Sequence, residues 1–162
     1  MSAIKDTQDI VNQMKGSWIN STMGSFHFGN PQEVDNIHNK TLPLLVMNTP
    51  QITIQTKAWN SNTISCDSSW TFVVYNNIPS TYNVTNDITI LGLWDTMENQ
   101  TLFWFYDWWY YFENSYGVEF IMTSPIQITR LKESSNDRLL GLKVTFGFNF
   151  YRYCKELTNP PS

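Results

Sequence analysis

The stretch RLLGLKVTFGFNFYRY, residues 138–153, alternates apolar residues with polar or small ones over most of its length. A period of two places every second side chain on the same face of a β-strand. One face of this strand collects six large apolar residues: Leu140, Leu142, Val144, Phe146, Phe148 and Phe150. Lys143, Thr145 and Asn149 fall on the opposite face. The segment therefore predicts a long strand with one buried side.

The segments before this strand repeat its period of two. GVEFIMTSPIQITRL, residues 117–131, predicts a second long strand in which Pro125 indicates an edge position or a bulge. The polar run KESSND, residues 132–137, predicts the hairpin loop between the two strands. Further strands are predicted at LPLLVMN (42–48), QITIQTKAW (51–59), SSWTFVVYNN (68–77) and NDITILGLWD (86–95).

The amino-terminal segment has the longer period of an amphipathic helix. Four apolar residues fall on one face of that helix: Ile4, Val11, Met14 and Trp18. Ser2 supplies an N-cap, and Gly16 indicates the end of the helix. Residues 20–40 are polar and contain Gly24, Gly29 and Pro31, which predicts a long loop.

The decapeptide FWFYDWWYYF, residues 103–112, contains nine aromatic residues and Asp107. As a strand it would carry rings on both faces. As a helix, at about 100° per residue, it has a single stripe that faces the sheet. This predicted core stripe is Leu102, Phe105, Trp109 and Phe112. N-cap candidates at Asp95, Thr96 and Asn99 also favour the helix. The run is far shorter than the roughly 20 residues of a membrane span, and Asp107 interrupts it.

Rings remain on both flanks of this second helix, and one sheet cannot cover both flanks. Phe103, Tyr106 and Tyr110 lie on one flank, and Trp104, Trp108 and Tyr111 lie on the other. One interpretation is a wide internal core in which the Tyr and Trp polar atoms are bonded locally. The other is that a flank contacts another subunit, because Tyr and Trp dominate interface hot spots. We expect such a subunit interface at Trp104, Trp108, Tyr111, Phe103 and Tyr110.

A third interpretation of the rings is a stacking platform for carbohydrate. Such a platform needs polar groups beside the rings, and within this segment Asp107, Glu113 and Asn114 are the residues that offer them.

The elements together predict an α+β fold, with a single antiparallel β-sheet and two helices packed on one face. No repeat, linker or low-complexity block divides the sequence. We therefore expect one domain over residues 1–156 and a flexible carboxy-terminal tail over residues 157–162.

The composition of the 162 residues limits the function classes. The net charge of −4 and the scattered basic residues argue against a protein that binds nucleic acid by neutralising phosphates. Charged residues make up 15%, against about 25% in typical globular proteins, and a surface poor in charge favours assembly. The amino terminus lacks the apolar run of a signal peptide. We expect a reducing cytosol, in which Cys66 and Cys154 remain thiols.

The sequence offers little to support catalysis. His27, Glu33, Asp35 and His38 share one polar stretch, but their spacing matches no metal or acid–base motif. Phosphate-binding and nucleophile-elbow motifs are missing as well. We expect no catalytic, cofactor-binding or metal-binding residues and no cofactor. A small hydrolase that uses His27 and His38 is the enzymatic alternative.

Three segments of the sequence resemble the tail-terminator-like ring proteins of tailed bacteriophages that infect Bacteroidetes, crAss-like phages among them. They are FHFGNPQEVDN…LPLLVMNTP, ITILGLWDTMENQTLFWFYDWWYYFENS and PIQITRLKESSNDRLLGLKVTFGFNFYRYC. The last strand of such proteins begins at D-x-L-x-G and closes in Y-x-x-C. The matching residues are Asp137, Leu139, Gly141, Tyr151 and Cys154. The resemblance covers roughly residues 4 to 155, and the ring-rich second helix departs from it, since related chains carry mostly Leu and Ile there.

The resemblance implies a tail-terminator-like fold and a virion protein without enzymatic activity. Such a protein, assembled in the host cytoplasm, forms a homo-oligomeric ring of six or twelve copies in the neck or at the top of the tail. Its partners would be the adjacent connector and tail proteins, with DNA as passing cargo and no membrane. The alternatives are another virion adaptor, for head completion or in the baseplate, and a small carbohydrate-binding domain.

Overall fold

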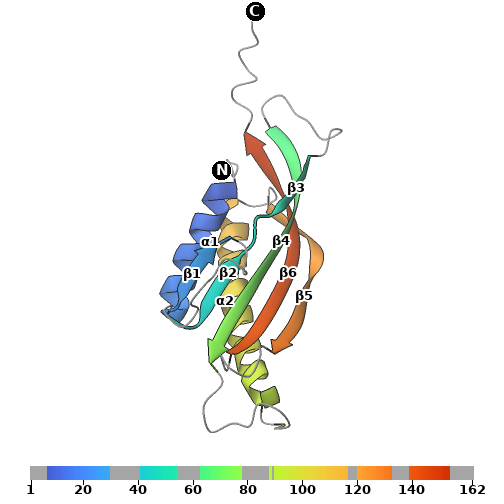
Figure 1. Ribbon diagram of the computed structural model, residues 1–162. Helices are drawn as coiled ribbons and strands as arrows, with labels where there is room; N and C mark the ends of the chain where they lie inside the picture. The colour runs from blue at the N-terminus through green and yellow to red at the C-terminus, as the bar shows by residue number, and fades with distance from the viewer. Residues whose placement is uncertain are drawn as a thin grey trace, which may run out of the picture.

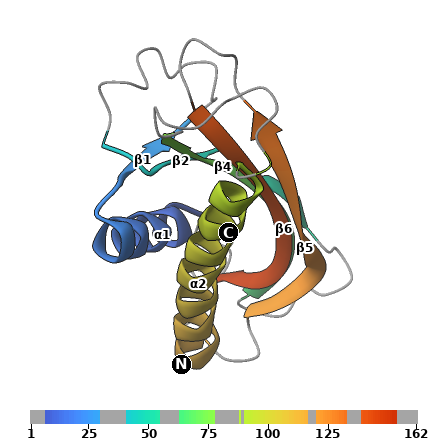
Figure 2. The ribbon, with the colours of Figure 1, turned by 90° about the horizontal axis from the view of Figure 1, so that it is seen from below.

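A computed structural model describes residues 7–29, 41–54, 63–77, 88, 90–116, 120–132 and 139–153. The chain forms, in order, α1 (Thr7–Thr22), β1 (Ser25–Phe28), β2 (Leu44–Met47), β3 (Gln51–Ile54), β4 (Thr63–Asn77), α2 (Ile90–Tyr116), β5 (Phe120–Lys132) and β6 (Leu139–Tyr153). Both helices lie on one face of the sheet, and the sheet curves around α2 (Figures 1 and 2). The α+β class expected from the sequence is confirmed.

The sheet is mixed, so the expectation of a purely antiparallel sheet was wrong. Its order is β1-β2-β4-β6-β5, and β3 pairs with β4. β1 runs parallel to β2, while the remaining pairs are antiparallel. β1 arises inside the segment predicted as a loop, where Phe26 contacts the core. Parallel neighbours need a long crossover, and residues 29–43 supply enough chain for one.

β4 and β6 form the centre of the sheet. β6 confirms the strand predicted at residues 138–153, and β4 contains the strand predicted at residues 68–77 and begins earlier, at Thr63. Their antiparallel register runs from Thr63 opposite Tyr153 to Asn77 opposite Leu139. All six even-numbered apolar residues of β6 predicted to face inward are buried. On β4, Trp70, Phe72 and Val74 share the same buried side. The alternation in the sequence therefore identified the face of the sheet that the helices cover.

β5 is the last strand at one edge of the described sheet. Its pairing with β6 shifts register between Met122 and Ser124 and again between Ser124 and Gln127. Pro125, which lacks a backbone N–H, lies inside this irregular stretch, so the predicted edge position and bulge are confirmed.

α1 is longer at its carboxy-terminal end than the sequence indicated. Ile10, Met14 and Trp18, spaced four residues apart, are buried along one face. The helix continues past Gly16 to Thr22 and ends where Met23 adopts a positive φ of 58° and its N–H bonds the Ile19 carbonyl at 2.9 Å. Gly16 is therefore not the helix end. Ser2 and Ile4 lie outside the described residues.

α2 begins earlier than predicted. Residues 90–95, expected to be part of a strand, form its first turns. The alternation Ile88-Thr89-Ile90 resembles a strand over a short window. Over a longer window, Ile90, Met97, Thr101 and Trp104 follow helical spacing, and all four are buried. The longer period determined the local structure.

The core between the helices and the sheet is rich in rings. Its largest fully buried side chains are Trp18, Trp70, Trp104, Trp108, Phe72, Phe146, Phe148 and Phe150. The indole N–H groups of Trp18, Trp70 and Trp104 have local acceptors. Trp70, for example, donates to the Ser68 hydroxyl at 2.7 Å. Ser68 in turn donates to the Phe148 carbonyl of β6 at 2.7 Å. The predicted tail, residues 157–162, and Cys154 lie outside the described residues.

Candidate functional site

The aromatic segment of α2 divides between the core and the surface. Trp104, Phe105 and Trp108 are at most 2% exposed. Phe103, Tyr106 and Tyr110, at positions i, i+3 and i+7, are 71%, 69% and 61% exposed. Side chains at this spacing form one continuous stripe on a helix. The segment therefore supplies both a core stripe and a separate surface stripe of three rings.

Trp104 and Trp108 were expected at a subunit interface, but both are buried inside the subunit, as the internal-core interpretation has it for this flank. The reason is that α1 covers this flank of α2. Trp104 donates its indole N–H to the Ser17 hydroxyl at 3.1 Å, and its ring meets Trp18 at a centroid distance of 5.0 Å. Two elements, the sheet and α1, cover a wider arc of α2 than a sheet alone would.

The other residues of the predicted interface lie at the surface. Phe103 and Tyr110 belong to the exposed stripe, and Tyr111 is 56% exposed on the flank beside α1. Of the predicted core stripe, Phe105 is buried and Leu102 and Trp109 are half-buried, while the side chain of Phe112 lies outside the described part.

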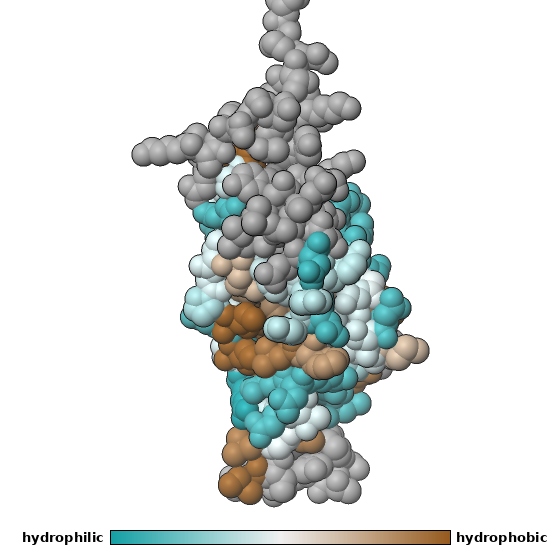
Figure 3. All heavy atoms as spheres, turned by 180° about the vertical axis from the view of Figure 1, so that it is seen from behind, coloured by the Kyte–Doolittle hydropathy of each residue, from teal (hydrophilic) through white to brown (hydrophobic). Residues whose placement is uncertain are grey.

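A hydrophobic groove of about 700 Å³ runs between α2 and the edge strand β5. We call it the aromatic groove. Its lining residues are Asn99, Leu102, Phe103, Phe105, Tyr106, Trp109, Met122 and Ile126. Seven of these eight side chains are apolar or aromatic. Figure 3 shows the helix side of the molecule, on which hydrophobic side chains form a band across the described surface. The contribution of β5 was not predictable from the sequence, because only the fold brings Met122 and Ile126 beside α2.

An ion-pair cluster fixes β5 against α2. Arg130 of β5 donates to Glu98 and to Asp95 of α2, both at 2.7 Å. Its guanidinium carbon also lies 5.8 Å from the centroid of the Trp94 ring. The hydrogen bond that Arg130 donates to Glu98, followed by the one it donates to Asp95, raises the pKa of Arg130 above its usual value, so this residue stays charged. The cluster holds together the two elements that line the aromatic groove.

The edge of β5 is poorly suited to pairing with another strand. Pro125 has no N–H to donate, and the register shifts around it distort the edge. A partner at this edge would therefore contact side chains of the aromatic groove rather than extend the sheet.

A second groove, of about 580 Å³, separates α1 from α2. We call it the interhelical groove. Its lining from α1 is Asp9, Asn12, Gln13, Gly16, Ser17, Asn20 and Ser21, and its lining from α2 is Asp107, Trp108 and Tyr111. The polar residues of α1 were not singled out from the sequence. The sequence does contain one indication of this lining: Asp9, Gln13 and Asn20, at i, i+4 and i+11, share one face of the helix.

Of the four residues considered for chemistry from the sequence, His27 lies in the described part of the chain. His27 lies on β1, and its Nε2 is buried without a hydrogen-bond partner among the described residues. Glu33, Asp35 and His38 lie outside those residues. The described part of the chain contains no group of three or more His, Cys, Asp or Glu side chains placed to hold a metal ion. Within the same part, neither helix is long and apolar enough to cross a membrane.

No protein-family model matches this chain, and no curated protein matches it significantly.

Proposed function

We propose that this protein is a non-enzymatic structural subunit that assembles with copies of itself into a ring in the neck or at the top of the tail of a bacteriophage. The resemblance of the sequence to tail-terminator-like ring proteins suggests the setting. The main observation that supports self-assembly is the exposed stripe of Phe103, Tyr106 and Tyr110 beside the aromatic groove.

Burial of this stripe in a subunit contact would account for its composition. Large exposed apolar patches on soluble proteins mark interaction sites, and Tyr is among the residues enriched at their centres. The stripe also lies on a rigid support, because α2 is packed on the sheet through Phe105 and held to β5 through Arg130. A rigid aromatic surface loses little conformational entropy on binding.

A ring requires a heterologous contact, in which the aromatic groove of one subunit meets a different surface of the next. A third groove, of about 550 Å³, lies across α1 from the interhelical one and is a candidate for that mate. It is lined by residues of α1, β1 and the segment around β3, including Val11, Phe26, Phe28, Pro50 and Ile52.

The face of the sheet without helices supports a passage for DNA. Across β4 and β6 it presents Thr71 with Thr145, and Asn149 hydrogen-bonded to Asp67. Lys143 of β6 lies on the same face, and the other groups named here are neutral or acidic. Such groups hold phosphates weakly, so DNA would slide past them.

Negative-stain imaging of the purified full-length protein tests the proposal. Closed rings of one symmetry with a central hole are expected. A monodisperse monomer that forms no ring, alone or with the neighbouring connector and tail proteins, would refute it.

A further inference from the structure

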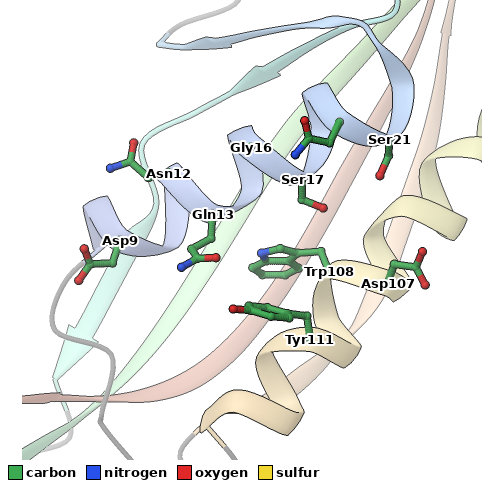
Figure 4. A pocket seen from close by; sticks show the side chains of 10 residues that line it. Asp9, Asn12, Gln13, Gly16, Ser17, Ser21, Asp107, Trp108 and Tyr111 are labelled. Carbon is green, nitrogen blue, oxygen red and sulfur yellow. The ribbon is translucent and has the colours of Figure 1, made fainter.

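The interhelical groove combines an aromatic surface with a dense set of polar groups. Figure 4 shows Trp108 and Tyr111 extending from α2 toward α1, and Gln13 and Ser17 extending back toward them. Trp108 is buried and forms the floor, whereas Tyr111 is more than half exposed. A ligand in the groove can therefore meet the exposed part of the Tyr111 ring.

The polar lining of this groove consists mainly of groups that both donate and accept hydrogen bonds. α1 contributes the amides of Asn12, Gln13 and Asn20 and the hydroxyls of Ser17 and Ser21. An amide has two donor hydrogens and a carbonyl acceptor, and a hydroxyl has one donor and two lone pairs. Ser17 accepts from the Trp104 indole, which leaves its own proton for donation. This inventory matches a ligand rich in hydroxyl groups.

The charges in the groove exclude anionic ligands. Asp9 and Asp107 line it, and none of its lining residues is Lys, Arg or His. Phosphates and sulfates would be repelled, whereas a carboxylate accepts readily from sugar hydroxyls. The volume of about 580 Å³ is within the usual range for small-molecule sites.

From these features we infer that the interhelical groove binds a neutral oligosaccharide of glucose configuration. Equatorial hydroxyls leave the two faces of such a sugar ring lined by C–H groups, which stack on an aromatic ring. Tyr111 supplies the stacking surface, and Asp107 with the amides of α1 bonds the hydroxyls at the rim. This inference does not rest on the proposed ring, since the exposed stripe of Phe103, Tyr106 and Tyr110 lies on the other flank of α2.

Titration of the purified full-length protein with cellotetraose and with chitotetraose tests the inference. The heat released on mixing measures binding directly. Intrinsic fluorescence should also change, because Trp108 lies in the groove. At least one sugar should bind saturably in the millimolar range or tighter. Tyr111→Ala should weaken that binding by about tenfold or more, whereas Tyr111→Phe should retain most of it.

Asp107→Ala should also weaken binding, and Tyr106→Ala, which removes an exposed ring from the other flank, should leave it unchanged. Because all three residues are exposed, their variants should keep the circular dichroism spectrum of the parent. The inference is overturned if neither sugar binds, or if sugar binding is unchanged in both Tyr111→Ala and Asp107→Ala. Tri-lysine, a cationic probe of the acidic groove, is titrated in parallel, and binding of tri-lysine without binding of either sugar would also overturn the inference.

Discussion

Trp18 of α1 and Trp104 of α2 meet edge to face, with ring centroids 5.0 Å apart and ring planes at 83°. Each indole N–H also has a partner: Trp18 donates to the Ser25 carbonyl of β1 at 2.9 Å, and Trp104 donates to Ser17 of α1 at 3.1 Å. The pair therefore links both helices to each other and to the sheet. It also fixes the rotation of α2, which determines that Phe103, Tyr106 and Tyr110 face outward.

The first prediction contrasts two neighbouring rings of α2. Trp104→Ala should lower the free energy of unfolding by about 3–5 kcal/mol, because it leaves a cavity between α1, α2 and the sheet. Phe103→Ala removes an exposed ring and should change the stability of the isolated subunit by less than about 0.5 kcal/mol. Urea unfolding in dilute protein, where subunits are dissociated, measures both. Similar losses for the two variants would show that the assignment of buried and exposed flanks is wrong.

A second prediction concerns the buried hydroxyl of Ser68. Ser68→Ala leaves the Trp70 indole N–H and the Phe148 carbonyl without the partner that joins them, and should cost about 1–3 kcal/mol. Ser69→Ala, the exposed neighbour on β4, is the matched control and should be nearly neutral. Thermal or chemical unfolding of the Ser68→Ala and Ser69→Ala variants, each compared with the parent, measures the two changes in stability. A neutral Ser68→Ala would contradict the hydrogen-bond assignment.

Two glycines should respond in opposite directions to alanine. A Cβ at Gly24 would overlap the carbonyl oxygen of Pro43, so Gly24→Ala should destabilise the fold by more than about 1 kcal/mol. Gly16 lies inside α1 with nothing within 4 Å of a Cβ, so Gly16→Ala should stabilise it by about 1 kcal/mol. The sign of each change in the unfolding midpoint is the test. Destabilisation by Gly16→Ala would argue against the helix continuing to Thr22.

The ion-pair cluster gives a prediction that depends on salt. Arg130→Gln removes both carboxylate contacts and should lower the melting temperature slightly. The difference from the parent should shrink at high ionic strength, since these groups are exposed to solvent. Lys143→Gln, on the helix-free face of β6, should show no such salt-dependent loss. A loss from Arg130→Gln that salt leaves unchanged would mean that packing on Trp94, rather than charge, holds β5 to α2.

The long alternating segments were predictable from the sequence, because period two over many residues leaves one consistent buried face. β6 and the half of β4 around Trp70, Phe72 and Val74 followed directly. The bulge at Pro125 was also predicted correctly. Proline has no backbone N–H to donate, which restricts it to the edge of a sheet or to a bulge in any fold. These features depend on local chemistry that the chain carries wherever it folds.

The remaining features depended on tertiary contacts that a single sequence does not reveal. β1 is only four residues long and lies between Gly24 and Gly29, so its parallel pairing with β2 leaves no periodic signal. The burial of Trp104 and Trp108 required knowing that α1 packs on that flank. The aromatic groove and the interhelical groove each combine residues far apart in the chain. Ile126 lies with Tyr106 in the first, and Gln13 lies with Tyr111 in the second.

We propose that the exposed stripe of α2 joins subunits into a ring. Native mass spectrometry of the triple variant Phe103→Ser, Tyr106→Ser, Tyr110→Ser, compared with the parent and with Tyr111→Ser, tests it most directly. We expect one ring mass for the parent and for Tyr111→Ser, and folded monomer for the triple variant. A triple variant that still gives rings of the parent's mass would contradict it.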